Sequence, residues 1–204
     1  MTHILFTHND LDGVGCGILA KLAYKEKIEI RYNSVHSLNH QVKHFLDNNN
    51  HNLFMYITDL SVNEDNEKAI SEWILHGGNG KLIDHHKSAL HLNENDWAAV
   101  TVSYDDGRLT SATSLLYDYL VDSELLDKNT ALDQFVELVR QYDTWEWDVN
   151  NNQKAKRLND LFYLLSIDEF EERMVNRLET DKVEFDFDDF EKQILDMEEN
   201  KMQR

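Results

Sequence analysis

Short apolar segments alternate with amphipathic ones along the first hundred residues. The apolar segments are rich in residues that favour strands, and they comprise residues 3–6, 28–32, 53–58, 81–83 and 98–104. The stretches between them place apolar side chains three and four positions apart, which predicts helices over residues 13–26, 37–47 and 62–75. This alternation predicts an α/β fold: a doubly wound, mostly parallel five-stranded sheet with helices on both faces.

The second half of the chain has helical spacing alone. It predicts five more helices, the last of them strongly acidic, and the first three span residues 109–123, 129–143 and 153–166. Residues 147–153, with the sequence WDVNNNQ, are the best candidate for a hinge. We therefore expect an α/β domain over residues 1–150 and a helical C-terminal extension or linker over residues 151–204.

Charge and composition limit the classes of partner. The chain has 20 basic and 39 acidic residues, a formal charge of −19, which is the wrong sign for gripping long nucleic acid through a surface field. No apolar stretch approaches the roughly 20 residues of a membrane span, and the N-terminus lacks a basic region or cleavage site. The single cysteine, Cys16, cannot form an internal disulfide. We expect a cytoplasmic protein with no membrane partner.

Three clusters of acidic and histidine residues follow three of the predicted strands. They are His8, Asp10 and Asp12 after the first strand, Asp59 after the third, and Asp84, His85 and His86 after the fourth. Each cluster alone could be a helix cap or a polar turn, and Asp12 in particular could cap a helix. The carboxyl ends of parallel strands share one edge of the sheet, so the clusters should meet there. Mixed imidazole and carboxylate ligands favour a transition metal, and Mn²⁺ is our choice.

Four ordered motifs resemble those of the DHH phosphoesterase family. They are HNDLDG at residues 8–13, Asp59, DHH at residues 84–86, and an aspartate, Asp143, within RQYDTWEW. The match covers about residues 1–150. HNDLDGVGCG and YDTWEW look closest to the oligoribonuclease branch of the nano-RNase B type, beside the RecJ-like exonucleases. Most members carry a second, smaller substrate-binding domain, DHHA1, which is not recognisable in this sequence.

The resemblance implies a role for each motif residue. Two metal ions, Mn²⁺ or alternatively Mg²⁺, Co²⁺ or Fe²⁺, would be held by Asp10, Asp12, Asp59, His85 and Asp143, with Asp59 bridging and His8 as an extra ligand. His86 would face the scissile phosphate, and Asp84 would orient a neighbouring imidazole. Three basic residues could contact phosphate, although a surface position is the simpler interpretation for each: Lys87, Arg108 and Arg140. Trp145 and Trp147 could stack a base, but packing explains them more simply.

Three functions are compatible with these residues. The first is a two-metal phosphodiesterase that hydrolyses short single-stranded RNA or DNA to nucleoside 5′-monophosphates. The second keeps the site but acts on pyrophosphate, polyphosphate, 3′-phosphoadenosine 5′-phosphate or a cyclic dinucleotide. The third is a non-catalytic interaction module, in which the acidic last helix docks a partner or a second copy of the chain. The apolar residues of that helix could equally pack within the chain, and they are Phe185, Phe187, Phe190, Ile194 and Met197.

Overall fold

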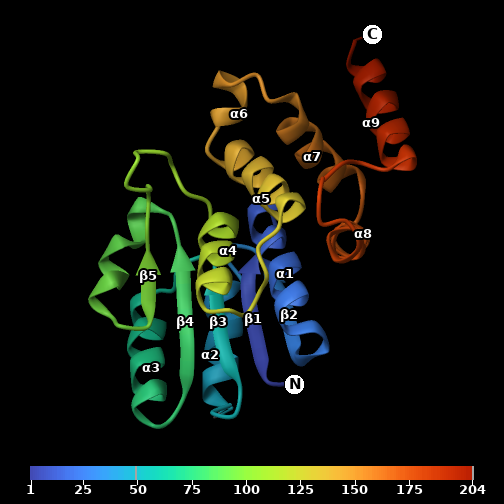
Figure 1. Cartoon of the computed structure of the whole chain (residues 1–204). Coiled ribbons are helices and arrows are strands. Elements are labelled where there is room, and N and C mark those ends of the chain that lie inside the picture. Colours follow the sequence, from blue (N-terminus) through green and yellow to red (C-terminus); the bar gives the residue numbers. More distant parts are fainter. Residues whose placement is uncertain (49, 204) are drawn as a thin grey trace.

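Five parallel strands form the centre of this computed structural model, which describes residues 1–48 and 50–203 (Figure 1). The strands are β1 (His3–His8), β2 (Ile28–Asn33), β3 (Phe54–Thr58), β4 (Asn79–Asp84) and β5 (Ala98–Val100). Their order is β2-β1-β3-β4-β5, and every neighbouring pair is parallel. The predicted α/β fold is confirmed. From β1 the chain moves to β2 on one side, and from β3 it moves to β4 and β5 on the other, so the strand order reverses between β1 and β3. Ligands of open α/β sheets bind at such a switch point.

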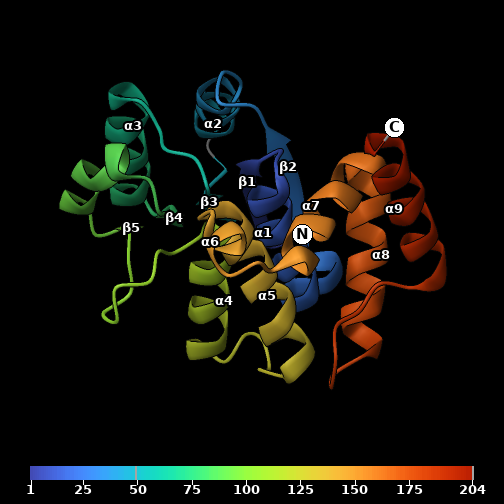
Figure 2. The same ribbon diagram turned by 90° about the horizontal axis from the view of Figure 1, so that it is seen from above.

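Helices cover both faces of the sheet, as Figures 1 and 2 show. One face carries α2 (Leu38–Asp47), α3 (Glu64–Leu75) and the short 3-10 helix η2 (Lys87–Glu94), and the other carries α1 (Leu11–Tyr24), α4 (Ala112–Asp122) and α5 (Thr130–Asp143). A 3-10 turn, η1 (Lys25–Lys27), leads from α1 into β2.

Strand β1 contributes side chains to two hydrophobic cores, one on each face of the sheet. Leu5 packs into the core beneath α1, whereas Ile4 and Phe6 pack into the core beneath α2 and α3. Successive side chains of a strand point to opposite faces of a sheet, so one buried strand can serve both layers. The middle of the strand, Ile4–Phe6, is therefore entirely apolar, and polar residues follow it from Thr7 onward.

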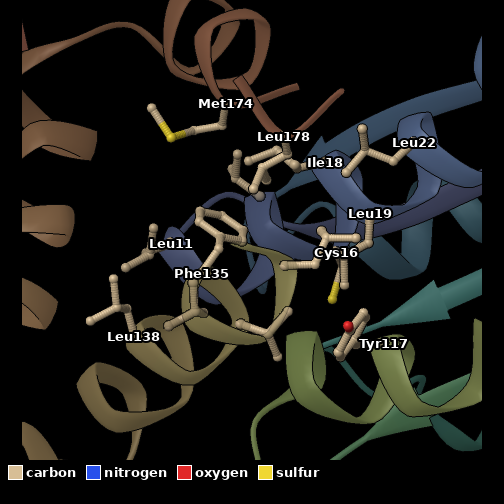
Figure 3. Packing of buried hydrophobic residues seen from close by; sticks show 14 of the residues in the cluster. Leu11, Cys16, Ile18, Leu19, Leu22, Tyr117, Phe135, Leu138, Met174 and Leu178 are labelled. Carbon is tan, nitrogen blue, oxygen red and sulfur yellow. The ribbon is translucent and has the colours of Figure 1, made fainter. Parts of the chain in front are cut away.

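The C-terminal helices pack onto the α1 side of the sheet. They are α6 (Glu146–Val149), α7 (Gln153–Leu164), α8 (Ile167–Thr180) and α9 (Asp189–Met202). Figure 3 shows Met174 and Leu178 of α8 in the same core as Ile18 and Leu22 of α1. The helical extension thus shares a hydrophobic core with the α/β unit, and a domain boundary at residue 150 stays a prediction.

Two details differ from the apolar pattern. The last strand stops at Val100, because Ser103 and Leu109 pair across a hairpin whose turn holds Gly107 at a φ of +90°. The expected hinge over residues 147–153 is partly occupied by α6. No helix within residues 1–48 or 50–203 has both the length and the apolar character of a membrane span.

The five apolar residues expected on the last helix do not form one stripe, although three of them, Phe185, Phe187 and Ile194, pack against the core. Phe185 and Phe187 precede α9 and are buried in the core, so packing within the chain explains these two residues. Phe190 and Met197 do lie on α9, but they are 47% and 55% exposed. The helical spacing was misread because α9 begins only at Asp189, where Asp188 and Glu191 form a capping box.

Candidate metal centre

The loop after β1 brings His8 against two carboxylates. His8 Nδ1 lies 2.9 Å from Asp10 Oδ2 and 3.6 Å from Asp59 Oδ2. Asp10 also caps α1, because its Oδ1 accepts a hydrogen bond from Gly13 N at 2.9 Å. A Cβ at Gly13 would lie 2.1 Å from the carbonyl oxygen of His8, so only glycine lets α1 start this close to the strand. The close approach keeps the polar loop over the end of β1.

Asp12 is held by a helix that lies a hundred residues further along the chain. Its two carboxylate oxygens accept hydrogen bonds from the backbone N–H groups of Ala112 and Thr113, both at 2.8 Å, at the start of α4. The Thr113 hydroxyl also donates to the Asp12 carbonyl oxygen at 2.7 Å. The positive end of a helix stabilises an ionised carboxylate there. Asp12 thus supports the start of α4, whereas the cap of α1 is Asp10.

His85 approaches carboxylates from three different parts of the chain. Its Nε2 lies 3.2 Å from Asp59 Oδ1, 3.4 Å from Asp12 Oδ2 and 3.4 Å from Asp143 Oδ2. Asp59 follows β3, Asp12 lies in the first turn of α1, and Asp143 ends α5. The structure therefore brings the last predicted ligand, Asp143, to the same edge of the sheet as the other three.

His86 points to a different partner from its neighbour. Its Nδ1 lies 2.7 Å from Asp84 Oδ1, and the Asp84 side chain is fully buried while that of His86 is 51% exposed. The imidazole that Asp84 holds is therefore that of His86. An ionised carboxylate can only accept a hydrogen bond, so this contact keeps a proton on His86 Nδ1. The other ring nitrogen, Nε2, does not take part in the contact with Asp84.

Among the residues that the structure describes, the potential ligand atoms form three sets, and some residues belong to more than one set. Within each set they lie within 4.8 Å of one another, and the sets are His8, Asp10 and Asp59; Asp12, His85 and Asp143; and Asp59, Asp84, His85 and His86. Asp59 and His85 each belong to two sets. Shared ligands between neighbouring sets are the arrangement that two adjacent cations need. Asp59 also adopts a φ of +61°, a costly conformation for a residue other than glycine.

The electrostatics of the cluster fit divalent cations. Asp59 Oδ2 is buried and has no hydrogen-bond partner within residues 1–48 and 50–203. Burial and the charge of Asp12 raise the pKa of Asp59 well above its usual range, and the same two causes raise the pKa of Asp143 to about 8. Hydrogen bonds to Asp10 and Asp59 raise the pKa of His8 to about 10. Each shift reflects crowded negative charge, which a bound cation would relieve.

A curated relative decides the family. The chain is 60% identical over 203 residues to Oligoribonuclease NrnB of Bacillus subtilis (strain 168), and the alignment covers 98% of the chain. The chain belongs to the DHH phosphoesterase family. It spans about half the length of this relative, 51%. No protein-family model matches the chain, so membership rests on this similarity together with the four motifs.

A solved structure shares the fold of this chain. The crystal structure of an uncharacterized protein from Helicobacter pylori G27 matches with a TM-score of 0.62 at 19% sequence identity. The match covers 88% of this chain and 56% of that one. At this identity the likeness shows a shared fold.

The three basic residues considered for phosphate contact in this DHH-family chain have different surroundings. Lys87 is exposed directly after His86. Arg108 is exposed in the hairpin, where its Nε donates to Asp106 Oδ2 at 2.7 Å. Arg140 is only 2% exposed and bonds to Glu137, Glu146 and the carbonyl oxygen of Leu109. The Arg140 guanidinium therefore joins α5 to α6 and the hairpin, and it is not available to a phosphate.

The two tryptophans near Asp143 also differ from each other. Trp147 stacks on Tyr142, with ring centroids 6.0 Å apart, and packs against the core, so the packing interpretation holds for it. Trp145 is 69% exposed and takes a φ of +64°. Trp145 therefore does not contribute to the core.

Sequence reasoning missed three residues at the metal centre. Tyr142, Asn159 and Tyr163 line a cavity of about 120 Å³ together with the candidate ligands Asp10, Asp12 and Asp143. Tyr142 could have been suspected from its place beside Asp143. Asn159 and Tyr163 lie on α7, in the predicted extension, and only the packing of α7 against α5 brings them to the site.

Proposed function

We propose that the chain is a two-metal phosphodiesterase that hydrolyses short single-stranded oligonucleotides to nucleoside 5′-monophosphates. The observation that carries this proposal is the sharing of Asp59 and His85 between neighbouring ligand sets. The relative that is 60% identical is named an oligoribonuclease, which supports RNA as the substrate class.

Two of the three ligand sets would each hold one of a pair of metal ions. His8 and Asp10 would bind one ion, Asp12, His85 and Asp143 would bind the other, and Asp59 would be shared. Bound divalent ions lower the pKa of a coordinated water and stabilise the attacking and leaving oxygens of an in-line displacement. The mixture of imidazole and carboxylate donors suits Mn²⁺, which we propose as the metal.

The residues around the ligands have separate tasks. The start of α4 fixes the orientation of Asp12 through the backbone of Ala112 and Thr113. Asp84 keeps one His86 proton on Nδ1, and His86 can donate to a substrate phosphate through Nε2 when that nitrogen carries a second proton. Lys87, which follows directly, can add positive charge at that position. These residues orient the substrate phosphate over the ligand cluster.

The charge of the protein favours short substrates. A formal charge of −19 opposes binding along a long polyanion, so attraction must come from cations in the site. A short oligonucleotide places few phosphates outside the site and suffers least from this repulsion. A cytoplasmic location and a homodimer stay predictions of the sequence.

The proposal is tested by measuring nucleoside 5′-monophosphate release from a short RNA and a matching short DNA with Mn²⁺. The Asp59→Ala variant should release none, while Asp105→Ala, which removes an exposed carboxylate of the hairpin, should behave as the unmodified chain. No release from either oligonucleotide would overturn the proposal. Faster phosphate release from pyrophosphate or 3′-phosphoadenosine 5′-phosphate than oligonucleotide cleavage would favour a small phosphate substrate.

A further inference from the structure

A small cavity beside the metal centre is lined partly by residues that are not candidate metal ligands. Asp10, Asp12 and Asp143 form one side of it. The remaining lining is neutral, and it consists of Leu11, Val139, Tyr142, Asn159 and Tyr163. The cavity therefore joins the cluster of metal ligands directly to a surface with apolar, aromatic and amide groups.

Asn159 is the most unusual member of this lining. It is only 7% exposed, yet its side chain makes no hydrogen bond to any residue in the described part of the chain. An amide that is largely buried and has no protein partner is unfavourable, since most of its contact with water is lost and no protein hydrogen bond replaces it. The amide offers both a donor and an acceptor, which is what the polar edge of a nucleobase can pair with.

Two aromatic rings complete the lining. Tyr142 is held by its stack on Trp147, with an angle of 18° between the two rings. Tyr163 is 71% exposed on α7, so its ring contributes little to the core. A rigid ring and an exposed ring at the mouth of one cavity provide stacking surfaces for a planar ligand.

The lining also restricts the chemistry of the ligand. It contains no lysine or arginine, so it offers no positively charged side chain to a second phosphate group. A volume of about 120 Å³ is well below the roughly 300–1,000 Å³ of sites that enclose a whole drug-sized ligand. A flat, uncharged ring with polar edges fits these limits, whereas pyrophosphate does not.

We propose that Tyr142, Asn159 and Tyr163 form a base subsite, which binds the nucleobase of the nucleotide whose phosphate lies on the metal centre. This inference rests on the proposed function and adds to it a source of selectivity for nucleotides. It also assigns a task to α7: the helical extension completes the substrate site of the α/β unit.

The test compares the affinities of AMP and ribose 5-phosphate for the Mn²⁺-loaded chain by titration calorimetry. The two ligands share the phosphate and the sugar, so any difference reports the base. AMP should bind about 5- to 100-fold more tightly, the range expected for one stacked base. Asn159→Ala and Tyr163→Ala should each weaken AMP binding at least about fivefold and leave ribose 5-phosphate binding unchanged.

The control is Phe190→Ala, which removes an exposed aromatic ring from α9 and should change neither affinity. A variant that weakens both ligands equally would indicate damage to the metal centre and not a base subsite. Equal affinity for AMP and ribose 5-phosphate in the unmodified chain, or no binding of either, would overturn the inference. If mononucleotide release from RNA persists in that case, the base subsite fails alone; if release is absent too, the proposed function fails with it.

Discussion

His85 Nε2 lies 3.2 Å from Asp59 Oδ1, although 26 residues separate the two in the chain. The contact follows from the pairing of adjacent parallel strands, in which Thr58 of β3 lies opposite Ile83 of β4. Asp59 follows Thr58 directly, and His85 follows Ile83 by two positions. Both residues therefore lie at the carboxyl edge of the sheet. Because both residues belong to two ligand sets, their contact is the point at which the two halves of the metal centre join.

Replacing Asp59 by Asn should lower the activity and raise the stability of the metal-free protein. The change removes a shared ligand and should lower kcat/KM for a short RNA by at least about 100-fold. It also removes a carboxyl group whose ionisation is opposed by burial and by Asp12, so the metal-free protein should become more stable at neutral pH by about 1–2 kcal/mol. Denaturant unfolding with a chelator measures the second effect, and Asp105→Asn on the exposed hairpin is the matched control. A lower free energy of unfolding for Asp59→Asn without metal would contradict the crowding of negative charge around Asp59.

Asp84→Asn should impair the reaction without emptying the site. The substitution disturbs the contact that fixes the tautomer of His86, and such supporting contacts are typically worth about 10- to 100-fold in activity. We expect kcat to fall by this factor while the Mn²⁺ content stays the same. Steady-state kinetics and metal analysis on the same samples decide the matter. Loss of manganese in parallel with kcat would make Asp84 a metal ligand instead.

Gly13→Ala should disturb the start of α1. The added Cβ would lie 2.1 Å from the carbonyl oxygen of His8, and backbone atoms cannot yield as a flexible side chain can. We expect a loss of stability of roughly 3 kcal/mol, as for other overpacked sites, together with weaker Mn²⁺ binding because His8 and Asp10 are displaced. Thermal unfolding and metal titration test the two parts. An unchanged metal affinity would show that the close approach does not position these ligands.

The metal-free protein should lose stability as the pH rises from 5 to 9. Asp143 keeps its proton up to about pH 8 in the folded state, whereas an unfolded aspartate releases it near pH 4. The folded state therefore binds more protons in between, so the free energy of unfolding falls with rising pH. His8, with a pKa raised from 6.5 to about 10, acts in the same direction above pH 6.5.

Urea denaturation with a chelator at several pH values measures this slope. Asp143→Asn should flatten it between pH 5 and 8, whereas Asp105→Asn should not. Added Mn²⁺ should stabilise the protein most at high pH, where fewer protons compete for the ligands. A stability that rises with pH in the absence of metal would contradict the assigned shifts.

The fold and the gathering of the acidic and histidine clusters at one edge were accessible from the sequence because both depend on local patterns. The alternation of apolar segments predicts the parallel sheet, and such a sheet places Asp59 and the residues of the DHH motif on one edge. The place of Asp143 came from the resemblance to the DHH family, since its position at a helix end is uninformative alone.

The supporting residues of the site were not accessible in the same way, because they depend on packing between distant segments. Thr113 meets Asp12 across 101 positions of the chain. Arg140 is withdrawn from the surface by Glu146, which lies on a helix that the pattern did not predict. Asn159 reaches the cavity only through the packing of α7 against α5. No periodicity or motif encodes such contacts.

Equilibrium dialysis against Mn²⁺, with the metal counted per chain, tests the central claim most directly. The shared positions of Asp59 and His85 predict two ions per chain in the unmodified protein and in Asp105→Asn, and fewer than two in Asp59→Asn at the same free Mn²⁺. One ion or none in the unmodified protein, or two ions held with unchanged affinity by Asp59→Asn, would contradict a two-metal centre built around Asp59.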